Sequence, residues 1–232
     1  MANQETTKIT LVDKAYELIK AEVLSGTLEP GSKIDIKDLC SRFNVSPTPV
    51  RLALNRLVED NLLINNPRKG MFVKEFDLTE MLELCDLRLM FDLFYVEEVI
   101  TTLQFNSDLR KKLQTNIEES RKFVNSLPET ADLSMYLKNY EYDYEFHELF
   151  LICTGNRKLV DVYNKINPFH YSVFIFNRQS LSKLDLQVSE HEAIFNAALN
   201  GDIEELQQAL RHHYENIKTA ISLVVKIKQM QW

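Results

Sequence analysis

The segment NVSPTPVRLALNRLVEDN, residues 44–61, determines the architecture of the first part of the chain. Its apolar residues recur at the i, i+3, i+4, i+7 spacing of an amphipathic helix and must face a core: Val50, Ala53, Leu54 and Leu57. Thr48, Arg51 and Asn55 then point outward. Pro47 stands at the first helical position, where its missing N–H costs nothing. The segment therefore predicts a helix with an apolar inner face and a polar outer face.

Two further helices are predicted before this segment. The first covers residues 11–25 and stops at Gly26. The second is the short stretch IKDLCSRF, which follows Asp35 as its N-cap and ends at a bend near Asn44. Ser46 is expected to cap the third helix in the same way. Two short helices separated by a tight bend are typical of a helix-turn-helix.

A basic hairpin is predicted directly after the third helix. The stretch LLINNPRKGMFVK, residues 62–74, contains two short apolar runs around a tip with Arg68, Lys69 and Gly70. This order is typical of a winged helix-turn-helix, whose third helix enters the DNA major groove and whose wing tip lies along the backbone or minor groove. Arg51 suits that role, because a guanidinium pairs with guanine O6 and N7. The alternative is a small helical module with a solvated charged face.

The chain of 232 residues divides by charge into two parts. Residues 1–74 hold 11 lysines and arginines against 9 acidic residues, whereas residues 75–232 hold 16 against 25. A mildly basic N-terminal part followed by an acidic remainder is compatible with DNA binding, because only the face that contacts DNA must be positive. We therefore predict a DNA-binding domain at residues 1–74 and a second domain at residues 75–232.

Composition narrows the class of protein further. With 45% hydrophobic residues and only 5 glycines and 6 prolines, the chain is expected to be mainly α. The N-terminus is polar, and no apolar run approaches the roughly 20 residues that span a bilayer, so no membrane is expected. The three cysteines have no metal or disulfide spacing, which indicates a reducing, cytoplasmic location.

The second domain is expected to be an all-helical bundle. Helical periodicity continues from Leu78 almost to the end of the chain and breaks only at polar or turn-forming residues. The six predicted helices span residues 78–103, 107–126, 131–154, 156–176, 184–200 and 202–227. Such a bundle would suffice as a dimerisation platform, so its inward-facing polar residues carry the functional information.

Three of the five histidines share helix faces with apolar residues and are expected to point inward: His147, His191 and His213. His212 has polar neighbours and should be solvated. Asp143 lies four residues before His147, a spacing that brings two ligands to one metal ion. These residues would form a site of three nitrogens and one carboxylate. The alternative is that each inward histidine is a hydrogen-bonded core residue, and the pattern alone leaves both open.

The first domain resembles a known family. The motifs SGTLEPGSKI, VSPTPVRLALNRL and PRKGMFV are similar to the DNA-binding domain of the GntR family, FadR-like branch. The resemblance implies that Lys37 contacts phosphate and that the recognition helix and the wing tip meet the DNA. With the outward Asn55 and the basic Arg68, the predicted DNA-contact residues are Lys37, Thr48, Arg51, Asn55, Arg68, Lys69 and Gly70.

Two positions depart from the pattern of that family. Pro47 stands where the family often has arginine, and Leu52 stands where it usually has glutamate. Loss of the arginine removes one base-contacting group, so an altered or relaxed sequence preference is expected. Binding itself should persist through Arg51, the wing and contacts to phosphate.

The tracts DYEFHELFLICTGNRKL and SEHEAIFNAALNGDIEELQQALRHHY resemble the FCD ligand-binding domain that accompanies this DNA-binding domain. In that family the aspartate and histidine of a D-x-x-x-H helix join two later histidines around a divalent metal. The implied ligands are Asp143, His147, His191 and His213, the same set that helical facing favours. Zinc, nickel, manganese and iron all suit these ligands.

Arg88 matches an arginine in the first effector-domain helix of the family. The resemblance implies that Arg88 neutralises the carboxylate of a small organic-acid effector that also coordinates the metal. An i, i+4 ion pair with Asp92 is equally compatible with the sequence.

The expected protein is a homodimeric transcriptional regulator, not an enzyme. Its two recognition helices would bind a double-stranded DNA operator, with an affinity that depends on the effector. Two alternatives remain open: a helical-bundle metalloenzyme that acts on a small organic acid, and a metal-stabilised dimerisation module without an effector.

Overall fold

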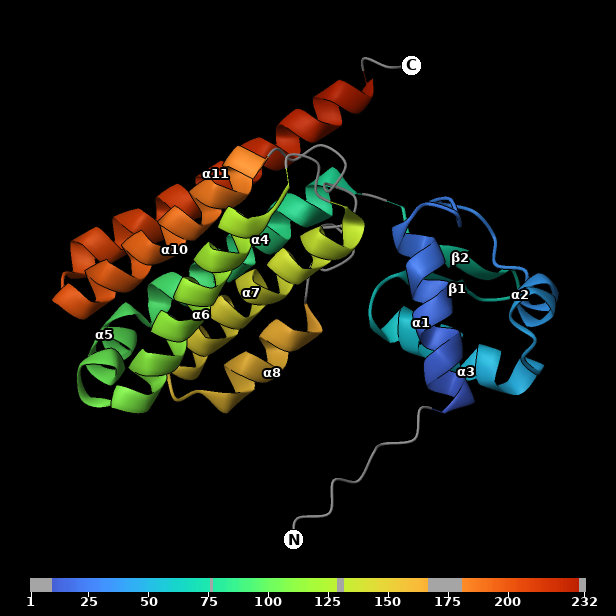
Figure 1. Cartoon of the computed structure of the whole chain (residues 1–232), viewed down its shortest axis with the longest axis horizontal. Coiled ribbons are helices and arrows are strands. Elements are labelled where there is room, and N and C mark those ends of the chain that lie inside the picture. The colour runs from blue at the N-terminus through green and yellow to red at the C-terminus, as the bar shows by residue number, and fades with distance from the viewer. Residues whose placement is uncertain (1–9, 76, 129–131, 167–180, 230–232) are drawn as a thin grey trace, which may run out of the picture. The chain divides into compact units, whose positions relative to one another are not determined.

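The computed structural model describes the chain except for residues 1–9, 76, 129–131, 167–180 and 230–232. The chain forms two compact units, residues 1–76 (unit 1) and residues 77–232 (unit 2). Figure 1 shows helices and a small hairpin in unit 1, and a bundle of helices in unit 2. The chain is thus mainly α with one small antiparallel sheet, as the sequence predicted.

Unit 1 contains three helices followed by a two-stranded sheet. The elements in chain order are α1 Leu11–Leu24, α2 Ile36–Phe43, α3 Pro47–Glu59, β1 Leu63–Asn66 and β2 Gly70–Val73. Thr10 and Asp35 cap α1 and α2, because their side chains accept hydrogen bonds from backbone N–H groups of the first turn. Ser46 is the N-cap residue of α3, as predicted, but its side chain accepts no hydrogen bond from the first turn. Pro49 at the third position of α3 has no N–H, so it removes one of the donors that an N-cap side chain accepts from.

The inner face of α3 forms the centre of the core of unit 1. The four residues predicted to face inward are all fully buried: Val50, Ala53, Leu54 and Leu57. α3 packs against α1 and α2, which contribute buried Ala15, Ile19 and Leu39. Asn44 takes a left-handed φ of 51° and turns the chain between α2 and α3. The predicted helix pair with its tight bend is therefore confirmed.

β1 and β2 form the predicted hairpin, with strand ends shifted by one residue. Asn66 pairs with Gly70 next to the turn. Gly70 has a φ of 105°, a conformation that L side chains rarely adopt, so glycine suits the start of β2. Lys33 forms an isolated bridge to Phe72, which ties the segment before α2 to the hairpin.

Unit 2 is built from helices alone in the residues that the structure describes. They are α4 Leu78–Phe94, α5 Val96–Phe105, α6 Ser107–Ser126, α7 Leu133–Ile152, α8 Arg157–Lys165, α10 Leu181–Asn200 and α11 Ile203–Gln229. The prediction of one helix over residues 78–103 was wrong, because the backbone leaves helical geometry at Tyr95 with a φ of -110° and a ψ of 22°. The predicted helix at 156–176 corresponds to α8, and its last residues from 167 onward lie outside the described part.

Buried apolar side chains of α5, α6, α7, α10 and α11 form one continuous core in unit 2. α10 and α11 lie side by side, and α11 also packs on α4 (Figure 1). Polar side chains interrupt the interior where α4, α7, α10 and α11 face one another. This polar interior is the candidate site. Within the described ranges, no helix is long and apolar enough to cross a membrane.

Candidate metal centre and DNA-facing surface

The predicted DNA-contact residues lie on the surface of unit 1. Thr48, Arg51 and Asn55 are exposed on the face of α3 that points away from its core. Leu52 lies on the same face with 49% of its surface exposed. The remaining predicted contacts lie on α2 and at the hairpin turn, exposed except for the partly buried glycine: Lys37, Arg68, Lys69 and Gly70.

The cations on this surface differ from the other arginines of unit 1. Among the described residues, the side chains of Arg51, Arg68 and Lys69 form no ion pair. By contrast, Arg42 and Arg56 are held by acidic residues of α1 and α2. The unpaired cations therefore remain available to phosphate or base edges, whereas the paired ones hold the helices together.

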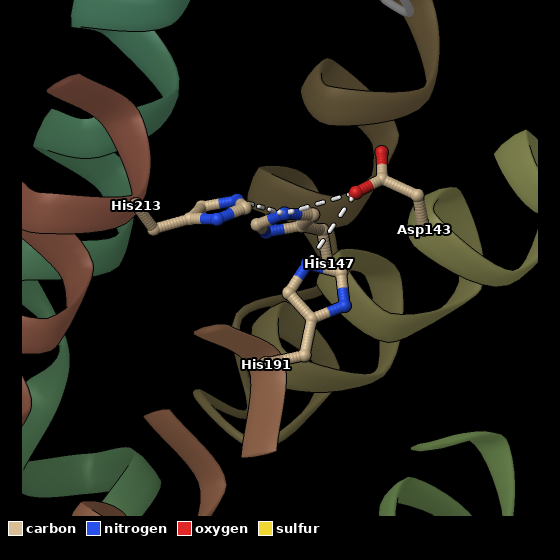
Figure 2. A group of neighbouring side chains, drawn as sticks. All are labelled: Asp143, His147, His191 and His213. Atoms are coloured by element: carbon tan, nitrogen blue, oxygen red, sulfur yellow. Dashed lines mark hydrogen bonds and ion pairs between the residues drawn. The ribbon is translucent and has the colours of Figure 1, made fainter. Parts of the chain in front are cut away.

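Figure 2 shows Asp143, His147, His191 and His213 pointing toward one another from α7, α10 and α11. Each offers one ligand atom, and these four atoms all lie within 4.8 Å of one another. His147 Nε2 is 3.2 Å from His213 Nε2 and 3.7 Å from Asp143 Oδ1. The same Asp143 oxygen is 3.4 Å from His191 Nε2. The structure thus brings the predicted ligands together, and it leaves His212 exposed.

This donor set fits a divalent metal ion. Ligand atoms held at about 2.1 Å around a tetrahedral ion stand about 3.4 Å apart, close to the separations of 3.2, 3.4 and 3.7 Å in this cluster. His191 Nε2 is buried and has no hydrogen-bond partner among the described residues. Such an unpaired nitrogen is costly, and a metal ion would satisfy it. Three imidazoles and one carboxylate suit zinc, nickel, manganese or iron.

Two further carboxylates lie near the Nδ1 atoms of two of the histidines. Glu190 Oε2 accepts a hydrogen bond of 2.7 Å from His213 Nδ1, which leaves the lone pair of His213 Nε2 directed at the cluster. Asp92 Oδ2 lies 3.7 Å from His147 Nδ1 and accepts a hydrogen bond of 2.8 Å from the Tyr214 hydroxyl. Glu190 thus orients the His213 ring in the way that outer partners of metal ligands do, whereas 3.7 Å is too long for a hydrogen bond from His147 to Asp92.

Glu190 was not predicted from the sequence. Its only signal is that it directly precedes a predicted ligand, and neighbouring helix residues point about 100° apart. The partner of Glu190 lies on α11, so only the packing of α10 on α11 reveals the contact. The two other glutamates that adjoin predicted ligands in the sequence point elsewhere: Glu192 pairs with Arg121, and Glu148 accepts a hydrogen bond from Asn164.

Burial determines the protonation of the cluster. It lowers the pKa of His147, assisted by the charge of Arg88, and it lowers the pKa of His191. Burial alone would raise the pKa of Asp143, but the neighbouring His191, His147 and Arg88 hold that pKa well below its usual range. His147 and His191 are therefore neutral imidazoles and Asp143 is an ionised carboxylate, the forms that bind metal.

A cavity of about 290 Å³ lies beside the cluster, between α4, α7, α10 and α11. Asp143 and Arg88 are both in its wall. Arg88 is only 6% exposed, and its Nη2 donates a hydrogen bond of 3.2 Å to the Tyr163 hydroxyl. Its Nε has no partner among the described residues. Burial alone would lower the pKa of Arg88, but Tyr163, Tyr214 and Asp143 raise it, so the guanidinium stays charged.

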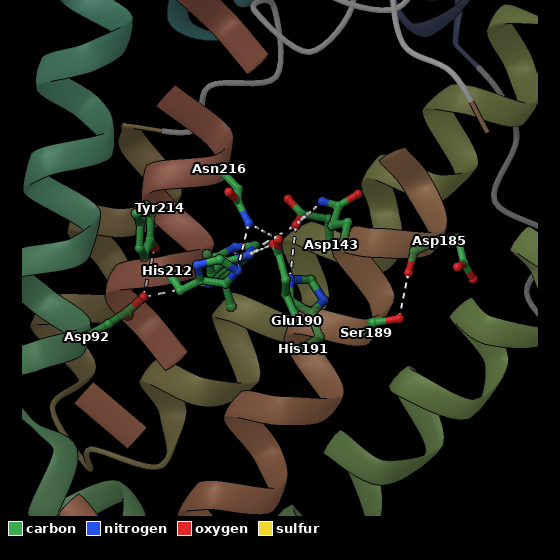
Figure 3. A network of polar contacts seen from close by, with 12 residues as sticks. Asp92, Asp143, Asp185, Ser189, Glu190, His191, His212, Tyr214 and Asn216 are labelled. Atoms are coloured by element: carbon green, nitrogen blue, oxygen red, sulfur yellow. Dashed lines mark hydrogen bonds and ion pairs between the residues drawn. The ribbon is translucent and has the colours of Figure 1, made fainter. Parts of the chain in front are cut away.

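The ion pair between Arg88 and Asp92 that the sequence allowed is absent among the described contacts. Asp92 instead accepts a hydrogen bond from Tyr214, as Figure 3 shows. Burial raises the pKa of Asp92 to about 6, although Tyr214 and Arg88 oppose the rise. Arg88 is therefore a buried cation in a cavity wall, and none of the carboxylates in the described part of the chain forms an ion pair with it, which is the chemistry of an anion site.

A winged helix-turn-helix joined to a helical unit with a buried cluster of this kind defines a DNA-binding regulator. Residues 11–73 match the model of the bacterial regulatory proteins of the gntR family, and residues 83–216 match that of the FCD domain. The chain belongs to the GntR family of transcriptional regulators, with an FCD domain in unit 2. These domains make it a regulator and not an enzyme, so the metalloenzyme alternative is dropped.

The chain is similar to regulators over nearly its whole length. It is 24% identical over 201 residues to the uncharacterized HTH-type transcriptional regulator YdhC of Bacillus subtilis, which covers 87% of this chain and 86% of the relative. It is 27% identical over 222 residues to the uncharacterized regulator BphR of Paraburkholderia xenovorans, with coverage of 93% and 85%. Among solved structures, Escherichia coli McbR/YncC has a TM-score of 0.67 at 17% identity, covering 95% of this chain and 100% of that one. The fold is thus shared with a known structure.

Proposed function

We propose that this chain is a cytoplasmic, homodimeric regulator whose affinity for a DNA operator responds to a small carboxylate bound at a divalent-metal site. The observation that carries the proposal is the buried quartet of Asp143, His147, His191 and His213 beside a cavity that also contains charged Arg88. A merely structural quartet would need neither a cavity nor an unpaired cation next to it.

In unit 1, α3 is the proposed recognition helix. Thr48, Arg51 and Asn55 would meet base edges in the major groove, because they share its exposed face. Lys37 would contact phosphate from α2, and the hairpin turn would lie along the backbone or minor groove. In a dimer, two such helices would bind two half-sites about one helical turn or more apart.

In unit 2, Asp143 and the three histidines would hold the ion. When bound, the metal would supply positive charge that attracts an organic carboxylate. Arg88 would pair with the same carboxylate through its unpartnered N–H, and charge-assisted pairs of this kind are strong when buried. A cavity of about 290 Å³ suits a small organic acid.

Thermodynamic linkage determines how far the bound acid changes the affinity for the operator. An acid alters DNA binding only by as much as it binds the DNA-competent and DNA-incompetent states differently. Couplings of this type are typically about 1–3 kcal/mol, which corresponds to roughly 5- to 150-fold in operator affinity.

A gel shift on DNA upstream of the gene that encodes the chain tests this function. Specific binding should weaken with salt, and Arg51→Ala should weaken it by about 1–3 kcal/mol. With protein loaded in turn with Zn²⁺, Ni²⁺ and Mn²⁺, short carboxylic acids should change the operator affinity, and Arg88→Met should abolish that change. If chelation lowers thermal stability but no acid alters DNA binding at saturating metal, unit 2 is a metal-stabilised dimerisation module instead.

A further inference from the structure

Leu52 is an apolar side chain on the outer face of α3. It has 49% of its surface exposed, whereas Leu54, two positions later, is fully buried. Three polar side chains are exposed on the same face of the helix: Thr48, Arg51 and Asn55. Successive residues of a helix point about 100° apart, so Leu52 and these three side chains lie within an arc of about 100°. Leu52 therefore belongs to the proposed major-groove surface and not to the core.

A leucine in the major groove can recognise only an apolar feature of a base, because its side chain has no hydrogen-bond donor or acceptor. Guanine, adenine and cytosine present hydrogen-bonding groups at that edge, whereas thymine also presents its C5 methyl group. Covering a donor or acceptor with leucine removes its water without replacing the hydrogen bond, which is costly. Covering the methyl group removes apolar surface from water, which is favourable. Leu52 should therefore favour thymine over each of the other bases.

The polar neighbours of Leu52 suit other features of the bases. Arg51 is exposed and carries a guanidinium, which pairs with the O6 and N7 acceptors of guanine. Thr48 also has a methyl group, but its hydroxyl can bond to several base edges, so Thr48 tolerates more than one base. Leu52 has no such alternative. The outer face of α3 thus combines side chains that form hydrogen bonds with one that requires an apolar partner, and discrimination for thymine is expected from Leu52.

We propose that Leu52 determines sequence specificity at the DNA interface, because its side chain packs against the C5 methyl group of one thymine in each half-site. This inference rests on the proposed function, since it assumes that α3 enters the major groove of an operator. Burying one methyl group corresponds to about fourfold in affinity. Loss of that methyl group from both half-sites of a dimer's operator should therefore weaken binding about 15-fold.

Selection from a random duplex library supplies the DNA for the test. The full chain is used with and without divalent metal and short carboxylic acids. The wild type should enrich duplexes with thymine at one position of each half-site, and Leu52→Ala should enrich the same motif without a preference at that position. Deoxyuridine in place of that thymine removes only the methyl group. In fluorescence anisotropy this change should weaken wild-type binding about fourfold for each half-site and leave the affinity of Leu52→Ala nearly unchanged.

Two matched variants control for other origins of the effect. Thr48→Ser removes a methyl group one helical turn before Leu52 and keeps the hydroxyl, so the dependence on the thymine methyl group should persist. Leu11→Ala removes a leucine of α1 that is 61% exposed, and it should retain both the affinity and the thymine preference. Thermal melting checks that Leu52→Ala keeps the fold, as expected for a half-exposed side chain.

The outcomes separate this inference from the proposed function. An enriched motif that binds the wild type equally well with deoxyuridine at every thymine would overturn the methyl contact and leave operator binding intact. A dependence on the methyl group that persists in Leu52→Ala, or that disappears in Thr48→Ser, would overturn the role of Leu52. If no sequence is enriched in any preparation, the proposed operator binding fails together with this inference.

Discussion

Replacing Glu190 with alanine is predicted to weaken metal binding about 10- to 100-fold while the fold persists. Glu190 Oε2 receives the His213 Nδ1 proton at 2.7 Å, and its other oxygen accepts a hydrogen bond of 2.6 Å from Asn216. Without that carboxylate, the His213 ring is free to rotate and to carry its proton on Nε2, the atom that would bind the metal. The predicted loss corresponds to about 1.4–2.7 kcal/mol of binding free energy.

The matched control is Glu192→Ala on the same helix. Glu192 forms a partly exposed ion pair of 2.9 Å with Arg121, worth about 0–1 kcal/mol of stability, and its loss should leave metal affinity unchanged. The assay is competition for Zn²⁺ against a chromophoric chelator, on variants whose circular dichroism matches the wild type. Wild-type affinity in Glu190→Ala, or an equal loss in Glu192→Ala, would refute the argument that Glu190 orients a metal ligand.

Three further predictions concern the ligands, the DNA surface and the core. His147→Ala should abolish stoichiometric metal in elemental analysis and remove the rise in Tm on metal addition; a variant that keeps one ion per chain would contradict the quartet. Arg51→Ala should weaken specific operator binding by about 1–3 kcal/mol in fluorescence anisotropy, and an unchanged affinity would exclude Arg51 from the interface. Leu57→Ala should lower the free energy of unfolding by about 2–5 kcal/mol in urea, because Leu57 is fully buried. The exposed Leu52→Ala on the same helix should change it by less than about 0.5 kcal/mol, and similar values for both would contradict the described packing.

Elements with a local signal were predictable from the sequence. The apolar stripe of α3 and the left-handed turn at Asn44 both follow from residues within one or two turns of helix. The break at Tyr95 was not predictable, because no proline or glycine marks it. Asn156, far along the chain, donates a hydrogen bond of 2.9 Å to the Tyr95 hydroxyl, so tertiary contact accompanies the change of helix.

The candidate site also contains some features that the sequence indicates and others that it does not. Asp143 and His147 share a helix, and the apolar neighbours of His191 and His213 indicate that both face inward, so the quartet could be proposed from helical periodicity. Contacts between separate helices have no such signal in the sequence. Gln187 lies 44 residues from its partner Asp143, and only the packing of α10 against α7 brings the two together.

Helix α4 links the two halves of the proposed function. It begins at Leu78, directly after unit 1, and carries Arg88 in the cavity wall. The proposed metal ligands lie on α7, α10 and α11, and none of them lies on α4. A metal ion alone would therefore join those three helices, whereas an acid that bridges the ion and Arg88 would also fix α4 against them. For this reason metal is expected mainly to stabilise unit 2, and metal with acid is expected to change the affinity for DNA.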